Sequence, residues 1–389
     1  MNNVIPLSRL SEYPVISLFS GAMGLDLGLM AAGLAIAVSQ DIDKWCAETI
    51  RRNGHVLIEG DIRELIQCNP TCDFLLNPAR LRRQDVFAVV GGPPCQSIST
   101  AGKRKRTQDE RGTLYGQFIH VIKAIQPRFF VMENVKGLAS MPADIEDQDS
   151  KRLLDVILGQ FKNLGYHTVH AVVDAVHYGT PQFRERLVII GSRDNEPIFI
   201  PAPTHFHMHQ NAEMRWRTLF DAIGDLQDPG VHANFSPKIA YYLKMVPEGG
   251  NWRSLPAHET QRAMGGAFDS GGGKVGFYRR LAYGEPSPTL VTSPVQKATL
   301  LCHPREDRPL SVKEYARIQQ FPDDWVFEGK IGDCYRQIGN AVPVPLGKAI
   351  GQMLKAVALG NATIHVKRMR GTSVHDEMIK NTAIALTGL

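Results

Sequence analysis

The sequence predicts an α/β fold: a doubly wound, mostly parallel sheet accompanied by a second, smaller and irregular domain. Short apolar runs alternate with helix-like segments over the first half of the chain, as in strands joined by crossover helices. From about residue 195 this alternation gives way to proline, glycine, histidine and aromatic residues. The length of 389 residues also favours one large domain plus a smaller one.

The strands of the predicted sheet are short apolar runs, each followed by a turn or a helix. The first is residues 15–19 (VISLF), which runs into the glycine-containing turn SGAMG and an amphipathic helix (LDLGLMAAG). Further strands are expected at residues 35–39, 55–58, 86–90, 129–132, 166–173 and 187–191, and helices at 44–53, 114–125 and 151–164. Beyond residue 195, helical periodicity returns at 311–322 and 344–359, whereas MGGAFDSGGGKVG is typical of a loop.

Reactive and charged side chains stand where the predicted strands end. In strand order these residues are Ser20 and Gly21, Asp41, Asp61, Cys95 and Glu133. Ligands of doubly wound sheets bind beyond the carboxyl ends of the strands. The sequence therefore predicts a ligand site at this edge of the sheet.

The turn after the first strand, FSGAMG, is typical of a nucleotide-type cofactor site. Its glycines let the backbone approach a ligand at a helix N-terminus. Asp41 is suited to ribose hydroxyls, and Asp61 could accept a hydrogen bond from an adenine amino group. A full G-x-G-x-x-G is absent, which argues against a dinucleotide. The alternative interpretation is a plain strand-turn-helix with aspartates that cap helices.

The segment GGPPCQSIS (91–99) is more specific. Two prolines stiffen the approach to Cys95 and fix the direction of its side chain. A thiol at the end of a parallel strand and next to a basic loop is well placed to act as a thiolate. The flanking glycine, proline and polar residues disfavour the alternative, a small buried core residue.

Net charge and cysteine usage indicate which partners, cellular compartment and metal sites to expect. The net charge of +5 is mild, and the basic run 103–106 (KRKR) would by itself be taken as a solvated surface. Six cysteines without a disulfide rhythm, no membrane-spanning apolar run and no secretory signal pattern predict action in the cytoplasm. Cys68 and Cys72, and the alternating histidines of HFHMH (205–209), lack a second cluster at ligand spacing, so no metal is expected.

Over nearly its whole length the sequence resembles the DNA (cytosine-5)-methyltransferases. The matching blocks stand in the family's order: VISLFSGAMGLDLGL, SQDIDKWC, GDI, GGPPCQSIS with RGTLY, MENVKGL, YGTPQFRERLVIIG, SVKEYARIQQFPDDW and QIGNAVPVPLGKAI. Two departures are Met23, where many members have glycine, and Asp41, where glutamate is commoner. The resemblance implies S-adenosylmethionine as cofactor, no metal, and double-stranded DNA as substrate.

The resemblance assigns the catalytic roles. Cys95 would add as a thiolate to C6 of cytosine, which makes C5 nucleophilic toward the sulfonium methyl group. Glu133 would bind or protonate N3, and Arg186 would contact O2. Arg184 would organise the pocket, since alternate residues of a strand share one face. The alternatives are a surface acid for Glu133 and a solvated strand face for the arginines.

The resemblance also assigns binding residues and domain bounds. The cofactor residues would be Phe19, Ser20, Gly21, Gly24, Leu25, Asp41, Ile42, Asp61, Ile62, Pro94, Asn340 and Val342. The DNA-contacting residues would be Gln96, Ser99, Lys103, Arg111, Gln182 and Thr289, with the KRKR run on phosphates. Residues 1–194 plus 336–389 would form a discontinuous catalytic domain, and residues 195–335 a target-recognition domain.

Three other functions compete with this interpretation. A tRNA methyltransferase of the same fold would have a reduced recognition region, and a non-catalytic DNA-binding regulator would have lost Cys95, Glu133 or the QxRxR residues. The missing dinucleotide motif disfavours a nicotinamide dehydrogenase. The architecture suggests a prokaryotic or phage enzyme that acts as a monomer, with a restriction endonuclease for the same DNA site as its companion.

Overall fold

The computed structural model describes residues 13–94, 113–143, 151–271 and 274–361. The chain divides into two compact units. Unit 1 comprises Met1–Asp174, Glu185–Pro203 and Pro345–Leu389, and unit 2 comprises Ala175–Arg184 and Thr204–Val344.

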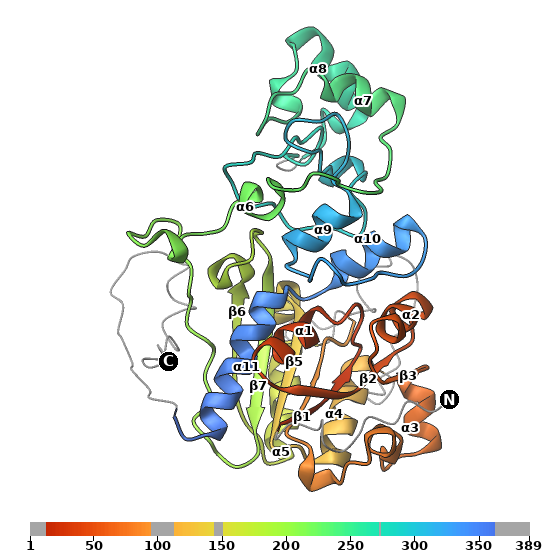
Figure 1. Cartoon of the computed structure of the whole chain (residues 1–389), viewed down its shortest axis with the longest axis vertical. Helices are drawn as coiled ribbons and strands as arrows, with labels where there is room; N and C mark the ends of the chain where they lie inside the picture. The colour runs from red at the N-terminus through yellow and green to blue at the C-terminus, as the bar shows by residue number, and fades with distance from the viewer. Residues whose placement is uncertain (1–12, 95–112, 144–150, 272–273, 362–389) are drawn as a thin grey trace. The chain divides into compact units, whose positions relative to one another are not determined.

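Unit 1 is built on a seven-stranded sheet of order β3-β2-β1-β4-β5-β7-β6 (Figure 1). Its strands are β1 (Pro14–Leu18), β2 (Ala35–Asp41), β3 (Leu57–Glu59), β4 (Ala88–Gly91), β5 (Phe129–Val135), β6 (His167–Asp174) and β7 (Glu185–Ser192). Strands β3, β2, β1, β4 and β5 pair in parallel, whereas β7 pairs antiparallel with both β5 and β6. The predicted mostly parallel sheet is therefore confirmed, with one reversed strand.

Several helices of unit 1 begin at a residue whose side chain caps them. They are α1 (Gly24–Ala31), α2 (Lys44–Arg52), α3 (Ile62–Cys68), α4 (Leu114–Ile125), α5 (Leu153–Asn163) and α11 (Val344–Ala358). The Asp43 carboxylate accepts hydrogen bonds from the first turn of α2, and the Thr113 hydroxyl caps α4 in the same way. Helix α11 comes from the end of the described chain, yet Gly347 lies directly against the Leu25 carbonyl of α1.

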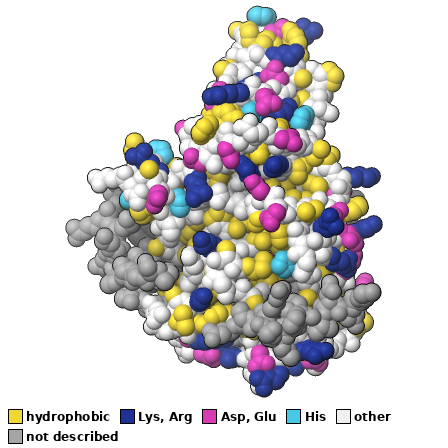
Figure 2. Space-filling model, viewed as in Figure 1, with side chains coloured by type: hydrophobic (Ala, Val, Ile, Leu, Met, Phe, Trp, Pro, Cys, Tyr) yellow, Lys and Arg dark blue, Asp and Glu magenta, His cyan; other side chains and the backbone are white. Residues whose placement is uncertain are grey.

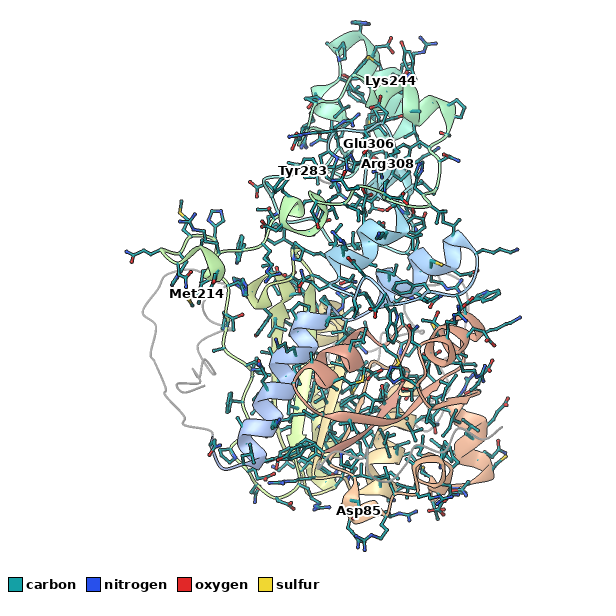
Figure 3. The ribbon with its side chains drawn as sticks, viewed as in Figure 1. Asp85, Met214, Lys244, Tyr283, Glu306 and Arg308 are labelled. Carbon is teal, nitrogen blue, oxygen red and sulfur yellow. The ribbon has the colours of Figure 1, made fainter. Side chains whose placement is uncertain are left out.

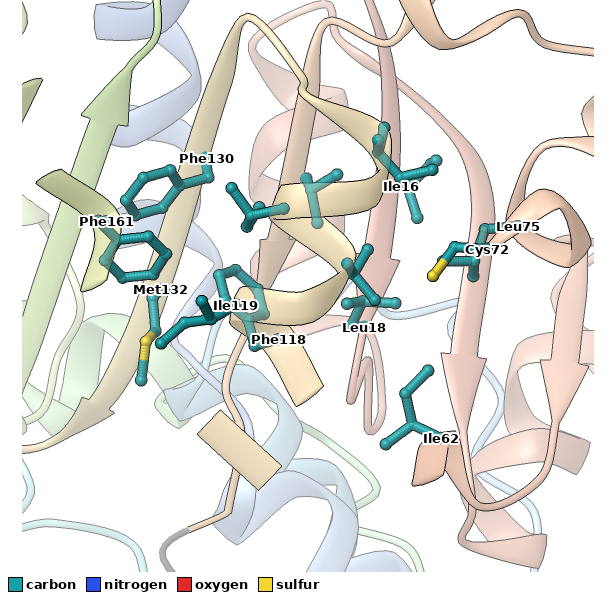
Figure 4. Packing of buried hydrophobic residues seen from close by; sticks show 14 of the residues in the cluster. Ile16, Leu18, Ile62, Cys72, Leu75, Phe118, Ile119, Phe130, Met132 and Phe161 are labelled. Atoms are coloured by element: carbon teal, nitrogen blue, oxygen red, sulfur yellow. The ribbon is translucent and has the colours of Figure 1, made fainter. Parts of the chain in front are cut away.

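The main core of unit 1 lies between the sheet and helices α3, α4 and α5. Alternate strand residues such as Ile16 and Leu18 on β1, and Phe130 and Met132 on β5, face these helices (Figure 4). Phe130 stacks on Phe161 of α5, with ring centroids 4.0 Å apart. The intervening residues of the same strands are also buried. Burial on both faces explains why these strands read as continuous apolar runs.

Unit 2 is irregular, as predicted, and consists mainly of loops and short helices. Its α-helices are α6 (Leu219–Ile223), α7 (Pro237–Leu243), α8 (Ala257–Met264), α9 (Val312–Ile318) and α10 (Ile331–Asn340). A small hydrophobic cluster around Tyr242, Leu243 and Tyr278 supports α7 and α8. The segment 205–209 forms no strand, because only Phe206 makes an isolated bridge, with Arg215.

A buried ion network reinforces unit 2. Arg308 donates to both Glu306 and Glu314, with nitrogen–oxygen distances of 2.8 Å (Figure 3 labels Arg308 and Glu306). Glu314 also closes a capping box with Ser311 at the start of α9. Since Arg308 and Glu314 are both buried, removal of one partner would leave the other charge unpaired. The network therefore fixes the segment that leads into α9.

The surface of the described residues carries charges of both signs. In Figure 2, Lys and Arg side chains are scattered among Asp and Glu side chains over the visible face. Within the described part of the chain, no helix is long and apolar enough to cross a membrane.

Candidate active site

The turn between β1 and α1, residues 19–24, is held in a backbone conformation that ordinary residues rarely adopt. Phe19, Gly21 and Met23 all have positive φ, at 53°, 54° and 67°. The Ser20 carbonyl accepts from the Met23 amide at 2.9 Å, and the Ser20 amide donates to the Gln40 carbonyl at 3.1 Å. Met23 thus adopts the left-handed conformation that glycine favours. This segment is called the cofactor turn below.

Asp41 at the end of β2 ties the cofactor turn to the next strand. One carboxylate oxygen accepts from the Gly21 amide at 2.7 Å, and the other accepts from the Asp43 amide at 2.8 Å. Burial raises the pKa of Asp41, although these two backbone donors act in the opposite direction. Asp41 therefore presents a buried carboxyl group in contact with the glycine of the turn.

Gln40 is a residue of this edge that the sequence did not single out. Its side-chain oxygen accepts from the Phe19 amide at 3.5 Å, and its amide nitrogen donates to the Gly60 carbonyl at 2.7 Å. It is 1% exposed. Gln40 thereby links the ends of β1 and β3 through β2. The only sequence signal was its place before Asp41, where a polar residue ends an apolar strand.

Asp61 follows β3 and caps α3. Its carboxylate accepts from the Arg63 amide at 2.9 Å and from the Arg63 guanidinium at 3.0 Å, and these hydrogen bonds lower its pKa. An adenine amino group would have to share this carboxylate with Arg63. Ile42 is 60% exposed, whereas Ile62 and Leu25 are buried, so Ile42, unlike these two, can cover a ring.

These residues fit a nucleoside-containing cofactor. A buried carboxyl at Asp41, a carboxylate at Asp61, the exposed Ile42 and the half-buried Phe19 provide polar contacts for hydroxyl and amino groups and apolar surface for a base. All of them lie in unit 1 at the carboxyl edge of the sheet.

A second group of predicted residues gathers where β4 and β5 end. A side-chain carbon on Gly92 would lie 2.9 Å from Oε2 of Glu133, so the glycine leaves room for the carboxylate to lie against this backbone. The Asn134 amide donates to the Pro93 carbonyl at 2.9 Å and fixes the segment that leads to Cys95. Pro94 is exposed, and Cys95 lies outside the described residues.

Glu133 pairs with Arg186 across the antiparallel strands β5 and β7. Nε of Arg186 lies 2.8 Å from Oε1 of Glu133, and both side chains are largely buried, with 13% and 12% exposed. In the register Glu133 faces Val188, and Arg186 faces Val135, so the two are diagonal neighbours that long side chains can bridge. Because β7 runs antiparallel to β5, the Arg186 guanidinium lies next to the Glu133 carboxylate.

Arg184 and Gln182 are placed differently from Arg186. Arg184 is 1% exposed and donates to the Leu290 carbonyl at 3.0 Å and the Gly339 carbonyl at 2.7 Å, all within unit 2. The buried Gln182 side chain donates from its amide nitrogen to the Gln319 side-chain oxygen, and its own oxygen accepts from the Leu290 backbone amide. Thr289 is exposed and donates to the Phe183 carbonyl at 2.7 Å. A DNA contact by Gln182 would require its present hydrogen bonds to be replaced.

The remaining predicted residues divide into two groups. Asn340, exposed, and Val342, buried, belong to unit 2. The residues Gln96, Ser99, Lys103 and Arg111 lie outside the described residues, as Cys95 does. A search of the described ranges finds no group of three or more His, Cys, Asp or Glu side chains that could hold a metal ion.

Solved structures with the same architecture define the class of this fold. A candidate DNA modification methyltransferase encoded within an E. coli prophage aligns with a TM-score of 0.60 and 22% identity, covering 89% of this chain and 99% of the other. A DNMT2 variant from Spodoptera frugiperda aligns with a TM-score of 0.58 and 16% identity, covering 88% and 99%. The fold is that of the S-adenosylmethionine-dependent methyltransferases.

The family model of C-5 cytosine-specific DNA methylases matches residues 13–356, and the chain belongs to this family. Type II methyltransferase M.PspPI of Psychrobacter sp. is 40% identical over 88% of this chain and 79% of its own length. M.Sau96I of Staphylococcus aureus is 41% identical over 88% and 76%. The chain is thus a DNA (cytosine-5)-methyltransferase, with DNA as substrate and S-adenosylmethionine as methyl donor, as the sequence predicted.

Proposed function

We propose that this enzyme methylates C5 of a cytosine that it flips out of duplex DNA within a short specific sequence, through a covalent bond between Cys95 and C6. The observation that carries the proposal is the Glu133–Arg186 pair, 2.8 Å apart, beside the Gly92–Pro93 segment that leads directly to Cys95. A paired carboxyl group and guanidinium, on strands next to the segment that precedes a cysteine in the sequence, match the needs of cytosine activation.

The reaction follows from the electronic structure of cytosine. C5 is a weak nucleophile, so the Cys95 thiolate adds to C6 and moves electron density to C5. Bound S-adenosylmethionine would supply an electrophilic methyl group to C5 and leave as S-adenosylhomocysteine. The C5 proton then leaves, and cleavage of the C6–sulfur bond restores the ring and releases the thiolate.

Glu133 and Arg186 would stabilise the ring during this addition. A carboxyl group at N3 neutralises the negative charge that develops there, and a guanidinium at O2 donates to the carbonyl oxygen. Since the two groups already pair with each other, the base would enter an arranged site in which Arg186 fixes the direction of Glu133. Arg184, bonded to Leu290 and Gly339, would act at a distance as a support.

The cofactor would bind along the ends of β1, β2 and β3. Asp41 would hold the ribose hydroxyls, Phe19 and Ile42 would cover the adenine, and Asp61 with Ile62 would frame its edge. Ser20, Gly21, Gly24, Leu25 and Pro94 would line the same pocket. The buried Asp41 carboxyl and the exposed Ile42 support this assignment.

DNA would be bound by two parts of the chain. Gln96, Ser99, Lys103 and Arg111 would contact the duplex near the flipped base, since a base must leave the stack before its ring can react. Residues 195–335, with Thr289, would read the base edges. Because the relatives M.PspPI and M.Sau96I are type II methyltransferases, we infer an enzyme of a restriction-modification system with a companion endonuclease. We further propose that it acts as a monomer in the cytoplasm.

A covalent trapping experiment tests this proposal. In DNA made with 5-fluorocytosine, methyl transfer leaves fluorine at C5 in place of the proton, so the enzyme cannot be released. The wild type and Cys68→Ser, a control at an exposed cysteine, should form a denaturant-resistant complex that requires S-adenosylmethionine. Cys95→Ser should form none. Equal trapping by Cys95→Ser would refute the assigned nucleophile, and no trapping by the wild type would direct the search to RNA.

A further inference from the structure

Asp26 is a buried acid that the proposed chemistry does not use. It lies in the first turn of α1, directly after the cofactor turn, and is 1% exposed. Among the described residues, neither of its carboxyl oxygens has a hydrogen-bond partner of regular geometry. Buried polar groups without partners are rare and costly, so each one requires a physical explanation. An apolar residue at this position would avoid the free-energy cost of burying a carboxyl group without partners.

The neighbours of Asp26 connect it to the cofactor turn. Ser17 on β1 is near enough to act on the Asp26 carboxyl, although it falls short of a regular hydrogen bond. The Ser17 hydroxyl oxygen in turn accepts from the Ser20 hydroxyl at 2.9 Å. Ser20 is the residue whose backbone bonds both Met23 and Gln40. A path of adjacent polar groups therefore runs from Asp26 to the centre of the turn.

We propose that Asp26 is a positioning residue of the cofactor turn, and that its buried carboxyl acts through Ser17 and Ser20 on the affinity for the cationic cofactor. This inference rests on the proposed cofactor site. It goes beyond it by assigning a function to a residue that need not touch the cofactor.

The charge state of Asp26 couples this residue to cofactor binding. Burial raises the pKa of Asp26 to about 7, Ser17 lowers it, and the nearby Asp41 raises it further. The group therefore changes charge near neutral pH. S-adenosylmethionine carries a positive sulfonium, so its binding favours the ionised form of a buried acid nearby. By linkage, ionisation of Asp26 must then strengthen cofactor binding to the same degree.

Few other charges act on this group. Asp41 is the charged neighbour on β2, and Asp43 at the start of α2 acts on Asp41. On α11, which packs against α1, Lys348 is exposed, and the Lys355 amine lies over the Tyr13 ring. Since Asp41 also titrates, a variant confined to Asp26 is needed to separate the two.

The test is calorimetric titration of the full-length protein with S-adenosylmethionine and S-adenosylhomocysteine between pH 5.5 and 8.5. We expect the wild-type affinity for S-adenosylmethionine to rise by up to about tenfold with pH, the equivalent of one pKa unit. Asp26→Asn, which keeps the shape but cannot ionise, should lack this rise. S-adenosylhomocysteine, without the sulfonium charge, should show a weaker rise in the wild type.

Two further variants test whether the effect belongs to Asp26 and its neighbour Ser17. Ser17→Ala should move the midpoint of the rise to higher pH, because the Ser17 hydroxyl lowers the pKa of Asp26. Asp85→Asn, at a distant acid paired with Arg82, should retain the wild-type profile. If both Asp26→Asn and Ser17→Ala kept the wild-type dependence of cofactor affinity on pH, the role assigned to Asp26 would be wrong, while the proposed cofactor site would stand. Absence of cofactor binding by the wild type would instead overturn the proposed cofactor site, and this inference with it.

Discussion

Replacement of Asp26 by asparagine should change how the stability of the enzyme depends on pH. In the unfolded chain Asp26 loses its proton near its ordinary value of 3.8, whereas in the folded protein burial raises the pKa to about 7. Between these values the unfolded state binds fewer protons than the folded state, so the wild type loses stability as pH rises. Asparagine does not titrate, and the loss should disappear.

The size of the effect follows from the pKa difference. One pKa unit corresponds to about 1.36 kcal/mol, and the two values differ by roughly three units, so the full effect is roughly 4 kcal/mol. At pH 5 the wild type has already lost about 2 kcal/mol of its stability through this pKa difference. Between pH 5 and pH 8, Asp26→Asn should therefore gain roughly 2–3 kcal/mol relative to the wild type.

Urea unfolding followed by far-ultraviolet circular dichroism at several pH values measures this difference. Asp85→Asn is the matched control: hydrogen bonds from Arg82 lower the pKa of Asp85, so this acid stays ionised over the whole window. Free energies of unfolding of wild type and Asp26→Asn that run parallel from pH 5 to pH 8 would refute the argument that burial raises the pKa of Asp26.

Three further predictions concern the catalytic residues and their supports. Glu133→Gln should reduce the rate of methyl transfer by 10²-fold or more and change DNA affinity little, as single-turnover and binding assays would report; equal losses would indicate a structural carboxylate. Gly92→Ala should lower the transfer rate with little loss of cofactor affinity, since the added carbon would lie 2.9 Å from Oε2 of Glu133; an unchanged rate would show that this contact is dispensable. Arg184→Met should destabilise the protein by about 2–4 kcal/mol in urea unfolding, because the buried Leu290 and Gly339 carbonyls lose their donors; a loss confined to activity would argue against a structural role.

Much of unit 1 could be predicted because its central strands are buried on both faces. Runs such as FFVM and LVIIG then carry a clear apolar signal, and in the parallel strands the polar residue that follows the run marks the functional edge. The reversed direction of β7 could not be predicted, because an apolar run carries no mark of its direction. Yet this reversal is what brings Arg186 to Glu133.

The contacts of individual polar residues were harder to predict. Gln182 in QFRER resembles a solvent-facing or DNA-facing side chain, but Leu290 and Gln319, more than a hundred positions away, bury and bond it. Gln40 and Asp26 likewise gain their roles from chain segments that meet only in the fold. The loops of unit 2 have no periodicity from which their path could be deduced.

The central claim is that this chain methylates cytosine in DNA through Cys95. Its most direct test is bisulfite sequencing, at base resolution, of a plasmid from cells that lack their own cytosine methylation and express the wild type or Cys95→Ser at equal soluble levels. We predict one short sequence methylated at a defined cytosine with the wild type and none with the variant. A plasmid left unmethylated by the wild type, or methylated equally by Cys95→Ser, would contradict the claim.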